Sequence, residues 1–180
     1  MTTAKLTPSG SQTVGPYFAI GLSYLIERSG VVAADAETIE IRGRVLDRDG
    51  VPVPDAMLEF WTSNPRDASG KGAFPYGFRR VCVDDNGNFC ALVNRPAPAP
   101  FSDGTMQSPH VLVLFFARGL LRHLISRLYF DDKPANLSDP VLLGIPAERR
   151  HTLIAKSEGA NSFRWDVILQ GPHETVFFAW

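Results

Sequence analysis

Turn residues divide this chain into apolar segments no longer than a strand, and this limits the folds open to it. The longest uninterrupted apolar run is Val111 to Ala117, far short of the roughly 18 residues of a membrane span. Residues 39–45 alternate apolar and charged side chains, which is typical of a half-buried strand. Further segments of this kind lie between turn signals at 56–61, 79–83, 88–93, 111–116, 126–130, 163–169 and 174–178. This spacing predicts an all-β fold, an antiparallel β-sandwich with a barrel as the alternative.

Asn86-Gly87 is the strongest turn signal in the chain. The pair favours a two-residue type I′ hairpin turn. In that register Cys82 and Cys90 fall on opposite faces of the sheet, whereas a longer turn would change this parity. We therefore expect two free thiols rather than a disulfide.

Two stretches lack a strand pattern and are predicted to be long loops. Residues 70–78 are rich in glycine and aromatic side chains, and residues 95–109 contain four prolines. Long loops inside compact domains are often functional. One or two short helices are expected, at 146–154 and, less clearly because of Pro140, at 137–143.

Length and charge point to one ordinary domain. The chain has 180 residues and a net charge of −1, so we expect a single domain over 1–180, with 1–37 as an extended N-terminal segment without clear periodicity. No Lys/Arg block indicates a nucleic-acid or membrane partner. The first residues lack the apolar region of a secretion signal, and the cytoplasm is the expected compartment.

The residues alone do not reveal a catalytic site. The four histidines, His110, His123, His151 and His173, include no pair spaced to share one face of a strand or helix. No nucleophile elbow or phosphate-binding loop occurs. His110 stands out only because it opens the most apolar strand, and a core histidine is the simpler interpretation.

Longer motifs add a resemblance. The stretch from Gly43 to Trp61 combines a strand, a turn, a proline-stiffened link and a strand that ends in a large aromatic residue. Further matching segments are 13–18, 117–121, 127–130, 139–142, 149–155 and 166–178. Together they resemble the intradiol ring-cleavage dioxygenases, and within that family the iron-poor α chains of its protocatechuate branch. The resemblance extends from about residue 10 to residue 178.

The resemblance implies an iron site that this chain does not complete. The family's catalytic chains bind Fe(III) through two tyrosines and a His-x-His pair on a strand. Here His110 matches the first histidine, while Leu112 and Ala99 stand at the positions of the second histidine and of one tyrosine. No tyrosine follows Trp61 closely, and Tyr76 matches a loop residue rather than a ligand. We therefore expect no metal ligand and no catalytic residue on this chain, with Fe(III) bound by a partner β chain.

The same resemblance implies a function. The expected role is that of an α subunit which, with an iron-bearing β subunit, supports O2-dependent intradiol cleavage of protocatechuate to 3-carboxy-cis,cis-muconate. Such a chain is an oxidoreductase subunit, inactive without β, in a hetero-oligomer of αβ units. The substrate-binding residues that it implies are Thr13, Gly15, Pro16, Tyr17 and Arg127.

Other interpretations stay open on sequence alone. Gly15-Pro16 can simply shape a turn, and Arg127 can be a surface cation or half of an ion pair. The whole chain can be a non-catalytic β-sandwich binding or scaffold module derived from the dioxygenase fold. A self-contained catechol or hydroxyquinol dioxygenase is disfavoured by the missing ligands.

Overall fold

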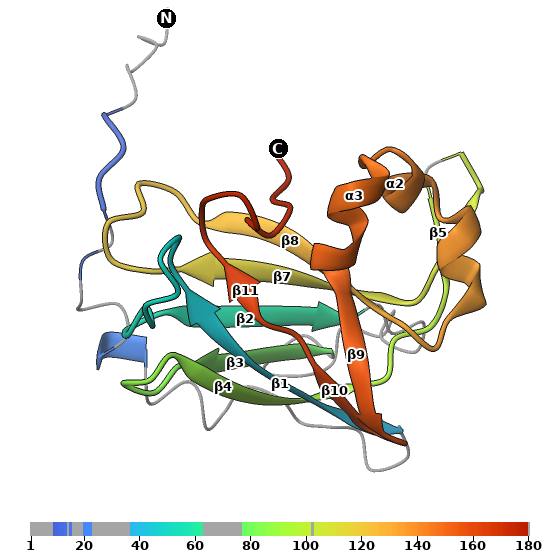
Figure 1. Cartoon of the computed structure of the whole chain (residues 1–180), viewed down its shortest axis with the longest axis horizontal. Helices are drawn as coiled ribbons and strands as arrows, with labels where there is room; N and C mark the ends of the chain where they lie inside the picture. The colour runs from blue at the N-terminus through green and yellow to red at the C-terminus, as the bar shows by residue number, and fades with distance from the viewer. Residues whose placement is uncertain are drawn as a thin grey trace, which may run out of the picture.

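Strands are the main regular element of the structure, a computed structural model that describes residues 9–13, 15, 20–22, 37–62, 77–101 and 103–179 (Figure 1). The strands are β1 (Thr38–Leu46), β2 (Met57–Thr62), β3 (Phe78–Cys82), β4 (Asn88–Asn94), β5 (Ala99–Pro100), β6 (Met106–Gln107), β7 (His110–Phe116), β8 (Leu124–Phe130), β9 (Ile154–Gly159), β10 (Ser162–Arg164) and β11 (Val167–Ile168). Short helices lie between β8 and β9: η2 (Pro134–Ser138), α2 (Pro140–Leu143), α3 (Ala147–Arg150) and η3 (His151–Leu153).

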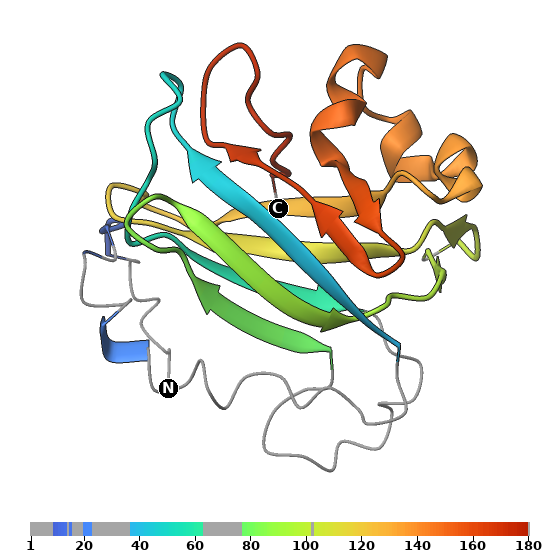
Figure 2. The ribbon, with the colours of Figure 1, turned by 60° about the horizontal axis from the view of Figure 1, so that its bottom comes forward.

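One mixed sheet holds the fold together, so the predicted antiparallel sandwich is not confirmed. Its order is β11-β1-β10-β9-β8-β7-β2-β3, and β4 pairs with β1. The pairs β1–β10, β1–β11 and β8–β9 are parallel. The sheet curls until it nearly closes into a barrel, as the two views in Figures 1 and 2 show. The helices between β8 and β9 supply the long crossover that a parallel pair needs.

The structure confirms the strands that had the strongest sequence patterns. β1 alternates buried and outward-facing residues along its length, and β7 lies between β2 and β8 as the predicted central strand. The predicted segment 163–169 splits into β10 and β11, and 174–178 forms no strand. β9 was missed because its middle residues, 156–158, are consecutively polar and exposed. The two-residue strands β5 and β6 lie inside the predicted loop 95–109.

Two apolar clusters form the core. The larger one fills the inside of the curled sheet, with Leu58, Phe60, Val113 and Phe163 among its buried members. The smaller cluster joins the helices to β8 and includes Tyr129, Leu142, Ile145, Leu153 and Val176. The helical segment therefore covers the outer face of one end of β8.

Gly43 permits the closest strand approach in this core. A Cβ atom at this position would lie 1.8 Å from the backbone oxygen of Trp165, a contact that no rotamer change can relieve. Only glycine allows β1 to pack this closely against the chain that follows β10.

The turn between β3 and β4 differs from the predicted two-residue hairpin. Gly87 has a φ of 73°, whereas Asn86 does not have a positive φ. The Asp84 N–H donates to the Asn88 carbonyl at 2.9 Å, and the Asp84 carboxylate accepts the Asn86 and Asn88 N–H groups, each at 2.9 Å. These side-chain bonds stabilise a three-residue loop, because an aspartate before a turn mimics a backbone turn of its own.

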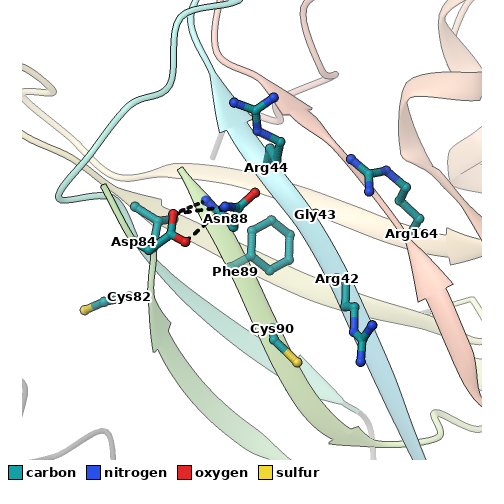
Figure 3. Close-up of a pocket in the computed structure, with 10 residues that line it drawn as sticks. Arg42, Gly43, Arg44, Cys82, Asp84, Asn88, Phe89, Cys90 and Arg164 are labelled. Carbon is teal, nitrogen blue, oxygen red and sulfur yellow. Dashed lines mark hydrogen bonds between the residues drawn. The ribbon is translucent and has the colours of Figure 1, made fainter. Parts of the chain in front are cut away.

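The longer turn changes the parity of the cysteines. Cys82 and Cys90 line one surface hollow instead of opposite faces, and both are free thiols, as expected (Figure 3). Burial raises the pKa of each thiol, so neither has the lowered pKa of a reactive cysteine.

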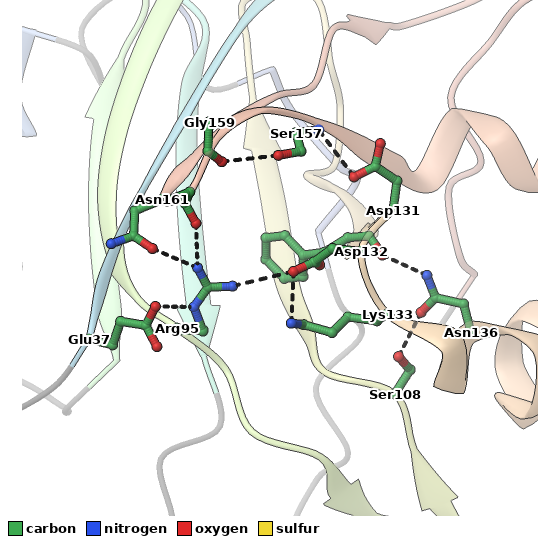
Figure 4. A network of polar contacts seen from close by, with 12 residues as sticks. Glu37, Arg95, Ser108, Asp131, Asp132, Lys133, Asn136, Ser157, Gly159 and Asn161 are labelled. Atoms are coloured by element: carbon green, nitrogen blue, oxygen red, sulfur yellow. Dashed lines mark hydrogen bonds and ion pairs between the residues drawn. The ribbon is translucent and has the colours of Figure 1, made fainter.

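Arg95 links the chain after β4 to the turn between β9 and β10 (Figure 4). Its Nη2 donates to the Ala160 carbonyl at 3.0 Å and to Asn161 Oδ1 at 2.8 Å, and its Nε lies 2.9 Å from Glu37 Oε1. The guanidinium also lies over the Phe163 ring, 5.6 Å from its centroid. This residue fixes the start of the 95–109 segment against the sheet.

The short helices match the prediction. Pro146 stands just before α3, and Pro140 begins α2, with Asp139 as the N-cap whose side chain accepts two backbone N–H groups. No helix in the described ranges is long and apolar enough to cross a membrane.

Candidate functional site

The candidate site lies on the outer face of β7 and β8. Alternation along β7 buries Val111 and Val113 in the main core, and it turns His110 and Leu112 to the other face. The antiparallel register then places Tyr129 opposite His110 and Arg127 opposite Leu112. Four side chains from two strands therefore share one patch of sheet.

The β5–β6 pair completes this patch. Ala99 pairs with Gln107 in that small ladder. The Gln107 side chain is 7% exposed, and its Oε1 accepts a hydrogen bond of 2.6 Å from Arg127 Nη1. The positions 99, 110 and 112, which the resemblance connects with metal ligands, are thus gathered around Arg127.

Tyr129 ties Arg127 to a buried carboxylate. The Tyr129 hydroxyl donates to Asp139 Oδ1 at 3.2 Å and lies 3.4 Å from Arg127 Nη1. Asp139 is fully buried, and it also accepts the N–H groups of Val141, Leu142 and Ser108 at 3.0, 3.0 and 2.8 Å. Burial raises the pKa of Tyr129 well above its ordinary value, so the phenol stays protonated and keeps donating.

His110 is held by the chain just before it. Its Nδ1 donates to the Ser108 carbonyl at 2.8 Å, because a carbonyl can only accept. Its ring centroid lies 5.5 Å from that of Tyr129. Burial lowers the pKa of His110, although the hydrogen bond to Ser108 opposes this shift. The bond to Ser108 and the contact with Tyr129 hold the ring in place, as in a structural histidine.

The donor atoms on this face do not fit a ferric centre. Leu112 and Ala99 carry no donor, and with Nδ1 bound to the Ser108 carbonyl, His110 offers only Nε2. In the described part of the chain, no three His, Cys, Asp or Glu residues gather where they could hold a metal ion. Iron normally needs several N, O or S ligands from the protein at one point. Tyr76 lies outside the described residues.

Arg127 keeps its positive charge without a carboxylate partner in the described part of the chain. Its two partners, Gln107 and Tyr129, are neutral, and both bind Nη1. The nearby Asp139 is occupied by four other donors. Among the described residues, Nε and Nη2 of this half-buried guanidinium have no hydrogen-bond partner. They form the edge that matches a planar carboxylate with two parallel hydrogen bonds.

The N-terminal candidates lie elsewhere on the chain. Thr13 Oγ1 accepts a hydrogen bond of 3.0 Å from the Gly119 N–H, at the turn between β7 and β8. Gly15 is half-buried and has a φ of 65°. At least four strand residues separate this turn from the level of Arg127, roughly 13 Å, so the structure does not bring Thr13 and Arg127 together. Pro16 and Tyr17 lie outside the described residues.

Two hollows that the described residues form lie on other strands. One, of about 550 Å³, lies over β1, β4 and β10 and is bordered by Arg42, Arg44 and Arg164 (Figure 3). Arg42 pairs with Glu40 and Arg164 with Asp166, while Arg44 donates to the Asn86 carbonyl. A smaller hollow of about 360 Å³ is lined by residues of β9, β10, β11 and the C-terminal segment. The balanced charges of the first hollow fit a solvated sheet face better than an anion site.

Sequence reasoning missed two members of the site. Gln107 lies in the predicted loop 95–109, and nothing in the sequence linked it to Arg127. Asp139 belonged to a matching segment but had no assigned role. The Asp139-Pro140 dipeptide is the usable signal, because it places a capping carboxylate before a proline at the first helical position.

Comparisons with known proteins agree with the resemblance seen in the sequence. The family model described as "Dioxygenase" matches residues 27–171. The chain is 40% identical to the protocatechuate 3,4-dioxygenase alpha chain of Burkholderia cepacia, over 99% of both chains. It is 25% identical to the beta chain of the same enzyme from that organism, over 92% of this chain and 77% of the beta chain.

A solved structure supports the fold. Hydroxyquinol 1,2-dioxygenase from Pseudomonas putida DLL-E4 superposes with a TM-score of 0.61 at 21% identity. The match covers 76% of this chain and 57% of that one.

Proposed function

Because this chain belongs to the dioxygenase family whose members cleave catechol rings in the intradiol manner, we propose that it is the α subunit of a protocatechuate 3,4-dioxygenase. In this proposal an iron-bearing β subunit binds the catechol oxygens and O2, and the complex forms 3-carboxy-cis,cis-muconate. The observation that carries the proposal is the near-complete match to an alpha chain, joined to a β7 face that does not offer a full set of iron ligands.

We assign the Fe(III) to the β subunit. Bound there, it supplies the oxygen chemistry on the catecholate. Leu112 and Ala99, at the level of Arg127 and Gln107 on this chain, offer no atom that could ligate it. The role of this chain is then to complete the walls of a site whose metal lies across the subunit interface.

Two parts of the chain are proposed to reach the substrate. Thr13, Gly15, Pro16 and Tyr17 would form wall contacts, with Gly15 allowing the backbone to come close to the ring. Arg127 would bind the carboxylate of protocatechuate, which the iron does not engage. Since Thr13 and Arg127 lie apart on this chain, they would line different sides of the site.

The partner and the compartment follow from the same premise. The β subunit is the proposed partner in a hetero-oligomer of αβ units, with residues 1–37 packing on it. The cytoplasm is the proposed compartment, because both cysteines are free thiols and reducing conditions preserve such thiols.

Co-expression with a β chain tests the proposal. The two chains should co-purify in equal amounts, and protocatechuate-dependent O2 uptake should appear only in the complex. A soluble monomer that does not bind the β chain would instead support the alternative of a non-catalytic scaffold module.

A further inference from the structure

We infer that Gln107 and Tyr129 are positioning residues that make Arg127 selective for a carboxylate. Both bind Nη1 of Arg127, at 2.6 and 3.4 Å, so one edge of the guanidinium is held by the protein. The inference rests on the proposed function, since it takes Arg127 as the residue that meets the substrate carboxylate.

The orientation of the Gln107 amide is determined by its surroundings. Its Nε2 lies 3.4 Å from the Pro100 carbonyl, to which it can only donate. Its Oε1 must then point to Arg127, which has only donors. Gln107 is buried and sits in the β5–β6 ladder, so its acceptor has a fixed place.

Tyr129 is fixed in the same way from the other side. Its hydroxyl proton goes to Asp139, which leaves oxygen lone pairs toward Arg127 Nη1. Asp139 cannot turn away, because three backbone N–H groups also bind it. The buried carboxylate is therefore linked to Arg127 through the Tyr129 hydroxyl.

The important feature is that both partners of Arg127, Gln107 and Tyr129, are neutral. A carboxylate in place of Gln107 would hold the guanidinium equally well but would cancel its charge. With neutral partners, Nε and Nη2 keep their full attraction for an anion, and their two parallel N–H bonds suit a planar carboxylate. The expected ligand class is an aromatic ring with a carboxylate, discriminated from the same ring without one.

Steady-state kinetics of the αβ complex test this, with protocatechuate as substrate and catechol as a competitor that lacks the carboxylate. Gln107→Leu should raise KM for protocatechuate about 5- to 20-fold, by analogy with loss of one supporting hydrogen bond. The value of kcat, the inhibition constant of catechol and the iron content should stay within about twofold of wild type. Arg42→Gln, an exposed arginine on β1, is the matched control and should change none of these.

A second variant separates positioning from simple structural support. Gln107→Glu keeps an acceptor for Arg127 but adds a negative charge. If the role is to present an uncancelled cation, this variant should raise KM for protocatechuate at least as much as Gln107→Leu. If Gln107→Glu behaves as wild type, Gln107 is only a structural acceptor and the inference is wrong. If the Gln107→Leu complex does not assemble, the KM of Gln107→Glu alone tests the positioning role.

Arg127→Ala distinguishes failure of the inference from failure of the proposed function. It should raise KM for protocatechuate about 5- to 150-fold, the range of a lost charge-assisted bond. If Arg127→Ala does so while Gln107→Leu does not, Arg127 binds substrate without the positioning network. If neither variant changes KM in an assembled complex, Arg127 is not a substrate residue and both proposals fall.

Discussion

Asp139 shows how a single buried carboxylate can organise the helices beside the candidate site. It accepts hydrogen bonds from two N–H groups of α2, from the Ser108 N–H and from the Tyr129 hydroxyl. No lysine or arginine pairs with it among the described residues, so backbone and phenol dipoles stabilise it. One side chain therefore connects the helix start, the segment before β7 and the outer face of β8.

Removing this carboxylate should therefore be costly. Asp139→Ala should lower the free energy of unfolding by about 2 to 3 kcal/mol, through loss of the N-cap and of charge-assisted bonds. Ser138→Ala, an exposed neighbour with one bond to the Ala135 carbonyl, is the control and should cost much less. Chemical denaturation of both variants measures the difference, and equal effects would show that Asp139 is not the organising residue.

Individual elements were predictable where burial alternates along the chain. The central strand β7 followed from its apolar residues, and α3 from Pro146 with the pattern after it. β9 was not predictable, because Lys156, Ser157 and Glu158 face solvent and the strand depends on its pairing with β8 and β10. The β5–β6 ladder lies in a proline-rich segment, so its role in placing Gln107 becomes visible only in the folded chain.

The candidate site, like the fold, was predictable only in part. The positions of His110, Leu112 and Ala99 could be connected through the resemblance. The structure places His110 and Leu112 on one face of β7 and pairs Ala99 with Gln107 in the separate β5–β6 ladder. The partners of Arg127 could not be predicted, because Gln107 lies 20 residues away and a polar residue in a loop carries no signal of its contacts. Register, rather than local pattern, creates this site.

The contribution of the turn between β3 and β4 to stability can be tested separately. The Asn88 side-chain amide, helped by the backbone N–H of Asn88, holds the pKa of Asp84 below its ordinary value. A lowered folded pKa gives stability that is present above the unfolded value, about 3.8, and is lost as pH falls through the folded value. Asp84→Ala should therefore lower Tm at neutral pH, and the gap to wild type should shrink as the solution is acidified toward and below pH 3.8.

Asp85, on the same turn, is the matched control. It accepts none of the hydrogen bonds that close the turn, so Asp85→Ala should leave Tm unchanged across the same pH range. A Tm gap for Asp84→Ala that stays constant with pH would mean that the turn does not depend on the ionised carboxylate.

At the scale of the whole molecule, exposed apolar side chains gather near the candidate site. Leu137 of η2 and Leu143 of α2 are 84% and 52% exposed, and Met106 and Phe101 at the β5–β6 pair are 54% and 41% exposed. Figure 1 shows these elements at one end of the molecule. Burial of such residues in a permanent complex would favour association.

The lone chain should therefore self-associate, and the β chain should prevent this. The double variant Leu137→Gln/Leu143→Gln should reduce self-association of the lone chain, as sedimentation velocity can measure. Leu121→Gln, which removes a leucine that is 60% exposed on the β7–β8 connection, serves as the control and should have little effect. Equal effects of the two changes would mean that the lone chain does not self-associate through this end of the molecule.

Iron content of the separate chains is the most direct test of the central claim, that this chain completes a dioxygenase without binding its metal. The lone chain and the αβ complex are purified in parallel, and iron per chain and the visible spectrum are measured for each. We predict no stoichiometric iron and no tyrosinate-to-iron absorption band for the lone chain. The complex should contain iron in proportion to its β subunits. A lone chain that carries about one iron per molecule, together with that band, would contradict the account.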